Sequence, residues 1–344
     1  MRTVTLETHS SFQVMSTRHV THKPVTIVSL LIILLLGGAL SACQLFPGRR
    51  DALTADGARQ VTRMRADSIP VHWSRDGATL YFTSHQGSYW ELWAAQPDGH
   101  DAHPVLGHLP FDIFSPSFSP DEQTIAFYSR RSGNFDIWTI SRTGENLRQL
   151  TTESAEDRWP VWRPDGQQIA FISTRDGEVG VWTMKPDGTE QRRFFHGGFG
   201  DWSPAWSPDG RFLVFPSRRF SKIKDILTIG LLSNTPDDSF EPGQSHVWRY
   251  DTTTGEKPIQ LTVGDANSWR PVWSPDGRWI ALTSDRTGNR DIWLMRPDGT
   301  GLRQVTTNPA HDRNAVWSPD GKRLAFGSNR TGRYEVWVID VPQP

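Results

Sequence analysis

Short apolar segments alternate with turns of similar sequence along most of the chain. In one repeat, apolar segments at 271–274 and 279–284 flank the turn Pro275-Asp276-Gly277. A third segment covers 291–295, and the repeat ends at 302–306 after a second turn at 296–299. Proline presets φ, aspartate binds nearby backbone N–H groups and glycine accepts positive φ, so these letters predict tight turns. Each repeat is therefore predicted to contain four short strands.

Six copies of the repeat can be counted by the aspartate of the first turn. These aspartates are spaced 45, 44, 44, 67 and 44 residues apart: Asp76, Asp121, Asp165, Asp209, Asp276 and Asp320. Periods of about 40 to 45 residues with several strands each are typical of propeller blades. The longer step indicates an insertion at 219–245, in blade four.

A recurring segment, RQLT or RQVT, ends the repeats at 148–151 and 303–306. The sixth repeat has no such segment after its third predicted strand at 334–339, whereas one copy, Arg59–Thr62, precedes the first repeat. We therefore predict that residues 59–62 supply the missing strand, which would leave no open edge in the last sheet. The predicted fold is all-β: a six-bladed β-propeller over residues 59–341, closed by an N-terminal strand that completes the last blade.

Tryptophan occupies two fixed positions of the repeat. Of the 16 tryptophans, five lie in first strands and six in third strands: Trp73, Trp162, Trp206, Trp273 and Trp317, then Trp93, Trp138, Trp182, Trp248, Trp293 and Trp337. Phe118 takes the vacant first-strand position in blade two. Because large aromatics fill the wedges between blades, we interpret these residues as core and not as a ligand platform.

The N-terminal segment carries the features of a secretion signal. The apolar run 25–40 follows Arg18 and Lys23, and at about 24 Å it is short for a membrane-spanning helix. Its end, Leu40-Ser41-Ala42-Cys43, resembles the lipobox of bacterial lipoproteins, which implies cleavage after residue 42 and lipidation of Cys43. A spanning helix and an unmodified Cys43 beside an ordinary cleavage site stay open as alternatives, as do Met1 and Met15 as the start.

The lipobox resemblance also implies a location. Gln44 is not the aspartate that retains lipoproteins at the inner membrane, so the resemblance implies the periplasmic face of the outer membrane, with residues 43–58 as a lipidated tether. Without residues 1–42 the chain has 34 basic and 37 acidic residues. No basic excess or stripe is present, which argues against a nucleic-acid partner.

The repeats carry the elements WSPDG, IAFxS, DIW and DGTxxRQLT. In these elements the chain resembles the TolB-like β-propeller family over residues 59–340. The resemblance implies a monomeric, non-enzymatic envelope protein whose loop face binds a protein partner or a cell-wall component, such as a peptidoglycan-associated lipoprotein. TolB itself has an α/β domain before its propeller, whereas only the predicted tether precedes this one. Related propellers gate serine peptidases or form the scaffold of polysaccharide lyases.

Charged residues recur in loops that antiparallel strand order places on one face. Acidic or amide side chains precede the first strands, arginines lie in the loops between second and third strands, and aromatics flank them: Asp67, Asp112, Asp157, Asp201, Asn267 and Asp312; Arg130, Arg175, Arg218, Arg286 and Arg330, with His85 in blade one; Phe114, Trp202 and Trp269. One interpretation is that Asp–Arg pairs stiffen the loops. The other is an acidic tunnel mouth that receives a basic peptide segment or a divalent cation, the one cofactor considered.

No catalytic residue or metal ligand is predicted, because the chain has no HExxH, no P-loop and no clustered Cys and His ligands. The alternative function is a periplasmic carbohydrate-active lyase or hydrolase that uses Asp, Arg and His from several blades. Two uses of the insertion stay open: it binds a partner, or it only decorates its own blade.

Overall fold

The computed structural model describes residues 54–177, 179–194, 202–218 and 245–342. All of them belong to one unit, residues 50–344. Their regular structure consists of 24 strands. No helix in this part of the chain is long and apolar enough to cross a membrane. The predicted signal peptide, Cys43, most of the tether, Asp201 and the insertion 219–244 lie outside the described residues.

The strands form six antiparallel sheets of four. Blades one to three contain β2 (Ser68–Trp73), β3 (Leu80–Ser84), β4 (Glu91–Ala95) and β5 (His103–Pro104); β6 (Phe114–Phe118), β7 (Thr124–Ser129), β8 (Asp136–Ser141) and β9 (Arg148–Gln149); and β10 (Asp157–Trp162), β11 (Ile169–Ser173), β12 (Gly180–Met184) and β13 (Arg192–Arg193). Blades four to six contain β14 (Ala205–Trp206), β15 (Phe212–Ser217), β16 (His246–Asp251) and β17 (Ile259–Gln260); β18 (Ser268–Trp273), β19 (Ile280–Ser284), β20 (Asp291–Met295) and β21 (Arg303–Gln304); and β22 (Asp312–Trp317), β23 (Arg323–Ser328), β24 (Glu335–Asp340) and β1 (Arg59–Gln60).

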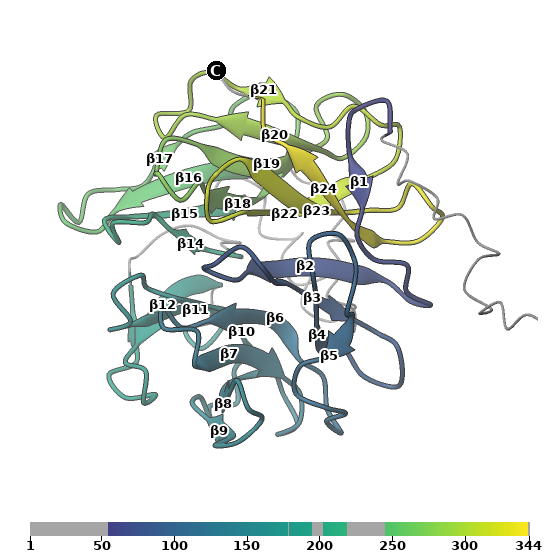
Figure 1. Cartoon of the computed structure of the whole chain (residues 1–344). Helices are drawn as coiled ribbons and strands as arrows, with labels where there is room; N and C mark the ends of the chain where they lie inside the picture. The colour runs from purple at the N-terminus through teal and green to yellow at the C-terminus, as the bar shows by residue number, and fades with distance from the viewer. Residues whose placement is uncertain (1–53, 178, 195–201, 219–244, 343–344) are drawn as a thin grey trace, which may run out of the picture. The chain divides into compact units, whose positions relative to one another are not determined.

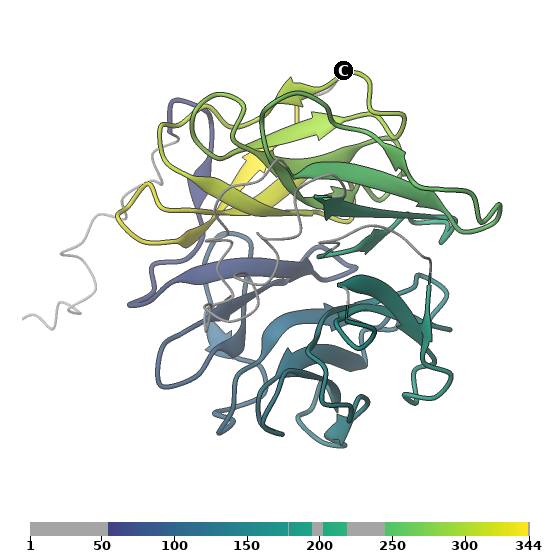
Figure 2. The same ribbon diagram turned by 180° about the vertical axis from the view of Figure 1, so that it is seen from behind.

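The last sheet contains both ends of the propeller sequence. β1 pairs with β24, with Arg59 opposite Val338 and Gln60 opposite Trp337. The purple β1 lies beside the yellow β24 in Figure 1, and Figure 2 shows the same neighbours from behind. The strand is shorter than predicted, but the N–H groups of Val61 and Thr62 still donate to the Val336 carbonyl, at 2.8 and 3.3 Å. Residues 59–62 therefore take the place that the repeat pattern assigns to them.

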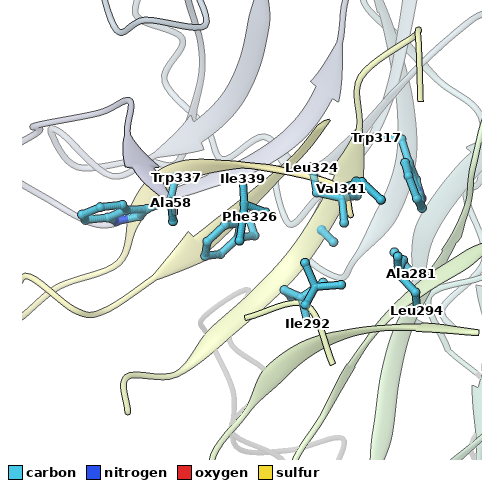
Figure 3. Packing of buried hydrophobic residues seen from close by; sticks show 12 residues of the cluster. Ala58, Ala281, Ile292, Leu294, Trp317, Leu324, Phe326, Trp337, Ile339 and Val341 are labelled. Atoms are coloured by element: carbon cyan, nitrogen blue, oxygen red, sulfur yellow. The ribbon is translucent and has the colours of Figure 1, made fainter. Parts of the chain in front are cut away.

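Apolar side chains fill the wedges between neighbouring blades. In Figure 3, Ala281, Ile292 and Leu294 of blade five face Trp317 and Leu324 of blade six. The tryptophans at the two repeat positions are buried or partly buried: Trp73, Trp138, Trp182, Trp206, Trp248, Trp317 and Trp337, then Trp93, Trp162, Trp273 and Trp293. Their predicted packing in the core is confirmed, and the partly buried Trp162 also faces the space between the first strands.

The threonine of RQLT explains why this segment recurs. In blade two, the Thr151 hydroxyl accepts the Ile137 N–H at 2.9 Å and donates to the Asp136 carboxylate at 3.1 Å. The N-terminal segment repeats the arrangement, because the Thr62 hydroxyl accepts the Val336 N–H at 2.8 Å and bonds the Glu335 carboxylate. Both hydroxyls are buried, so each would be costly to leave without a partner. This contact adds to the backbone pairing that holds β1 in the last blade.

The glycine of the second turn lies close to the preceding blade. A Cβ at Gly99 would be 2.2 Å from the carbonyl oxygen of Val61, and one at Gly299 would be 2.7 Å from that of Leu261. Gly99 also has a φ of +90°, which side chains other than glycine rarely adopt. The turn of blade one therefore packs directly on the N-terminal closing segment.

Candidate functional site

The first strands of all six blades surround a central cavity of about 350 Å³. Its wall includes Ile69–His72, Ser115–Phe118, Trp159–Trp162, Ser203–Ala205, Arg270–Val272 and Asn314–Val316. Because every first strand contributes, this cavity is the channel on the propeller axis. Concave sites to which several elements contribute are the usual positions of binding sites.

The channel wall is built from kinked backbone. One residue in each of blades two to six has a positive φ between 40° and 56°: Ser115, Trp159, Ser203, Arg270 and Asn314. The strand register shifts at this point in blades two, three, five and six, which marks a bulge. Blade one shifts register between Pro70 and His72. Such conformations cost energy in residues other than glycine and often mark functional sites. This feature was not predicted from the sequence.

The chemistry of the channel differs from the predicted acidic mouth. Its described lining has no aspartate or glutamate, and its titratable side chains are His72 and Arg270. Proline, valine and alanine make up much of the remainder, with hydroxyl groups from serine and Thr83. Of the predicted carboxylates, the four that the structure describes do not line this channel: Asp67, Asp112, Asp157 and Asp312.

His72 links two blades at the channel wall. Its ring stacks on Phe118 at 4.5 Å, and Nε2 lies 2.9 Å from Oε1 of Glu122. Burial lowers the pKa of His72, while the hydrogen bond to Glu122 opposes this shift. Glu122 has a φ of 59° at the position where the other first turns have glycine. The departure from Pro-Asp-Gly in blade two thus supplies a carboxylate that joins blades one and two.

Three predicted rim residues connect neighbouring blades. Asp67, Asp112 and Asn267 accept backbone N–H groups of the preceding blade at 2.8 to 3.0 Å. Glu156 and His311 do the same at 3.3 Å, and neither was predicted from the sequence. Asp67 does not have the strand register of Asp157 and Asp312, because Ser68 holds that position, opposite the last serine of the second strand.

Asp157 and Asp312 form buried ion pairs. Both residues are fully buried, and they lie 2.8 Å from Arg175 and 2.9 Å from Arg330 respectively. Arg330 also bonds Asp56 at 3.2 Å. These contacts support the interpretation that Asp–Arg pairs stiffen the loops. The two carboxylates cannot belong to an exposed acidic mouth, because they do not reach the surface.

Burial makes the stability contribution of Asp312 depend on pH. Desolvation raises the pKa of Asp312 to about 6, and the Arg330 charge only partly opposes this. The native state therefore binds this proton more tightly than the unfolded chain and gains stability as the pH falls from 6 to 4. Relative to Asp312→Asn, the wild type should gain up to about 1.4 kcal/mol per pH unit in this window, measured by urea unfolding. A difference that does not vary with pH would contradict this assignment.

The other predicted rim residues take separate places. Arg130 lies over the Phe135 ring at 4.1 Å, and the buried Arg218 lies over Trp202 at 5.4 Å. Phe114 and Trp269 are buried, so they are not exposed flanks of a channel mouth. Arg286 has no ion pair with a carboxylate among the described residues.

The predicted divalent cation would need several carboxylate or imidazole ligands close together at the rim. The described part of the chain has no group of three or more His, Cys, Asp or Glu that could hold a metal ion. The divalent cation stays a prediction without assigned ligands.

A ring of six four-stranded antiparallel sheets around a channel defines the chain as a six-bladed β-propeller. Residues 52–234 and 238–343 match the profile of the TolB beta propeller domain. The chain belongs to this TolB beta-propeller family. The resemblance seen in its repeats is therefore confirmed.

Individual relatives match in part. The Tol-Pal system protein TolB of Anaeromyxobacter dehalogenans is 31% identical over 109 residues, which are 31% of this chain and 25% of the relative. The chain thus spans about a quarter of that relative. The solved TolB of Acinetobacter baumannii has a TM-score of 0.60 at 18% identity, over 74% of this chain and 58% of that one. An oligogalacturonate lyase in complex with manganese has a TM-score of 0.53 at 15% identity, over 83% of this chain and 93% of the lyase chain. At these identities, the two solved structures share the fold.

Proposed function

We propose that the chain is a non-enzymatic binding protein of the bacterial envelope, anchored through Cys43 at the periplasmic face of the outer membrane. Its channel and the surrounding loop face would bind a protein partner, including one associated with peptidoglycan. The observation that carries this proposal is the cavity of about 350 Å³ to which all six blades contribute. The match to a Tol-Pal system protein supports a partner in the envelope.

The channel wall suits an extended segment of a partner. Proline and valine side chains offer apolar contact, and the partly exposed Ser115 and Ser203 add hydroxyl groups. Bulges interrupt the pairing of the first strands, which leaves backbone groups that an extended peptide could bond. Asp157 and Asp312 are buried and cannot contact a partner, so the partner segment need not be basic.

Filling the channel should prevent partner capture. Ala205 lines the cavity, so Ala205→Trp is expected to reduce capture at least tenfold by occupying the space that the partner needs. The measurement is photo-crosslinking in intact cells from a benzoylphenylalanine placed at Tyr89, an exposed aromatic residue between the second and third strands of blade one, with mass spectrometry of the adduct.

The control for this experiment is Lys257→Trp, which changes an exposed turn residue away from the channel wall. It should leave the adduct unchanged. An equal adduct in the Ala205→Trp protein would rule out the channel as the binding site. Turnover of a polysaccharide by the purified protein would contradict the non-enzymatic assignment.

A further inference from the structure

Two seams between neighbouring blades share one arrangement of charges. Between blades two and three, Asp136 begins the third strand of one blade and Asp157 begins the first strand of the next. Thr151 bonds Asp136 at 3.1 Å, and Arg175 bonds Asp157 at 2.8 Å. The seam between blades five and six repeats this set: Asp291, Thr306, Asp312 and Arg330. In each set two carboxylates lie around one guanidinium, and Asp56 adds a third carboxylate at the seam between blades five and six.

The seam between blades four and five keeps the cation and loses both carboxylates. His246 stands opposite Ser217, as Asp136 stands opposite Ser129. Ser268 stands opposite Ser284, as Asp157 stands opposite Ser173. The buried threonine and the arginine are retained as Thr262 and Arg286. At these four positions the cation is therefore kept without a carboxylate, and the acidic residue next to it in sequence is Asp285.

The partly buried Arg286 guanidinium contacts only neutral groups. Nε donates to Ser284 at 3.1 Å, and Nη2 lies 3.4 Å from the Ser268 hydroxyl. The carboxylate of the adjacent Asp285 bonds Asn267 at 2.7 and 2.9 Å. Burial lowers the pKa of Arg286, and the charge of the nearby Asp285 opposes this only in part, because that carboxylate bonds Asn267 and not the guanidinium.

A second donor lies beside this guanidinium. Nδ1 of His246 is buried without a hydrogen-bond partner among the described residues. The Ser268 N–H donates to the Ser245 carbonyl at 2.7 Å, which holds the residue next to His246 against Ser268. Burial and the charge of Arg286 both lower the pKa of His246. Arg286 and His246 provide donors for an oxyanion, and the Ser268 hydroxyl can add a third by turning from its long contact with Ser284, at 3.5 Å.

We propose that the seam between blades four and five binds a carboxylate group of a ligand through Arg286, His246 and Ser268. The ligand takes the role that Asp157 and Asp312 fill within the chain at the two other seams. A carboxylate matches the planar fork of the guanidinium and would lie where Asp157 and Asp312 bond the equivalent arginines. These three residues do not line the channel, and their binding of a carboxylate does not depend on the partner proposed for it.

Succinate is a suitable first probe, measured by thermal unfolding against sodium chloride of equal ionic strength. At about four times its Kd, succinate should raise the Tm of the wild type by about 1.5 °C, because about 1 kcal/mol of binding free energy acts on a unit that spans residues 50–344. Ser268→Asp supplies the carboxylate within the chain, so it should reduce this response at least fivefold. His246→Asp supplies a carboxylate at the position equivalent to Asp136, so it should also reduce the response to succinate.

Arg286→Gln removes the cation and should abolish the response, while Lys257→Gln, an exposed cation elsewhere, should retain it. A wild type that does not respond up to 100 mM succinate, or an equal response in wild type and Ser268→Asp, would overturn the proposal. An equal response to sulfate and succinate would also overturn the carboxylate assignment. A capped Gly-Asp-Gly peptide distinguishes an acidic protein side chain from a small carboxylic acid as the source of the carboxylate. If the peptide binds more tightly than succinate, the natural ligand is an acidic side chain.

Discussion

Replacing Arg330 by alanine is expected to lower the free energy of unfolding by about 3–5 kcal/mol. The guanidinium bonds Asp312 at 2.9 Å and Asp56 at 3.2 Å, and none of the three side chains is more than 4% exposed. The substitution leaves two buried carboxylates without their cation, which costs far more than the loss of an exposed pair. Urea unfolding followed by tryptophan fluorescence measures the difference.

Arg286→Ala is the matched control, because Arg286 occupies the same repeat position in blade five without a bonded carboxylate. Removal of the Arg286 guanidinium leaves no carboxylate without its partner, and it takes a positive charge out of a partly buried position. We expect a change of at most about 1 kcal/mol in either direction. Equal losses in the two variants would show that the carboxylates of blade six do not account for the effect.

Replacing Gly99 by alanine is expected to destabilise the propeller by about 2–4 kcal/mol. The new methyl group would lie 2.2 Å from the Val61 carbonyl oxygen, and the φ of +90° adds strain. The turn cannot move away without separating from the closing segment that it packs against. The effect should appear as a lower urea midpoint together with faster hydrogen exchange of the Val61 and Thr62 amides.

Gly264→Ala separates strain from contact. Gly264 has a similar φ of +97°, but no atom lies within 4 Å of the place that an added methyl group would take, so only the backbone cost of about 1 kcal/mol is expected. A loss as large as that of Gly99→Ala would attribute the whole effect to backbone conformation.

The ring of six blades could be predicted from the sequence because the same pattern of residues recurs in every blade. The spacing of Asp76, Asp121 and their equivalents indicates the number of blades, and the isolated copy at 59–62 indicates how the last sheet is completed. Buried tryptophans at fixed positions follow from the same count. Each of these inferences tolerates an error of one residue, because a blade is identified by its whole pattern.

The rim could not be predicted in the same way, because there a shift of one residue moves a side chain to another environment. Asp67 bonds a backbone N–H of the neighbouring blade, whereas Asp157 lies buried against Arg175. Both lie three residues before a proline, but Pro70 stands one residue earlier in the strand register than Pro160. In the same way, a comparison of strand registers is needed to see that His246 and Ser268 stand where two other blades have aspartate.

Completion of the last sheet also has a consequence for biosynthesis. Val336, which bonds Thr62, is translated 274 residues after it. At about 5–20 residues per second, the ribosome needs roughly 14–55 s to produce this partner. During that time the N-terminal segment has left the ribosome while its partner strand does not yet exist. A nascent chain released before residue 336 would retain the first blades but could not join its two ends.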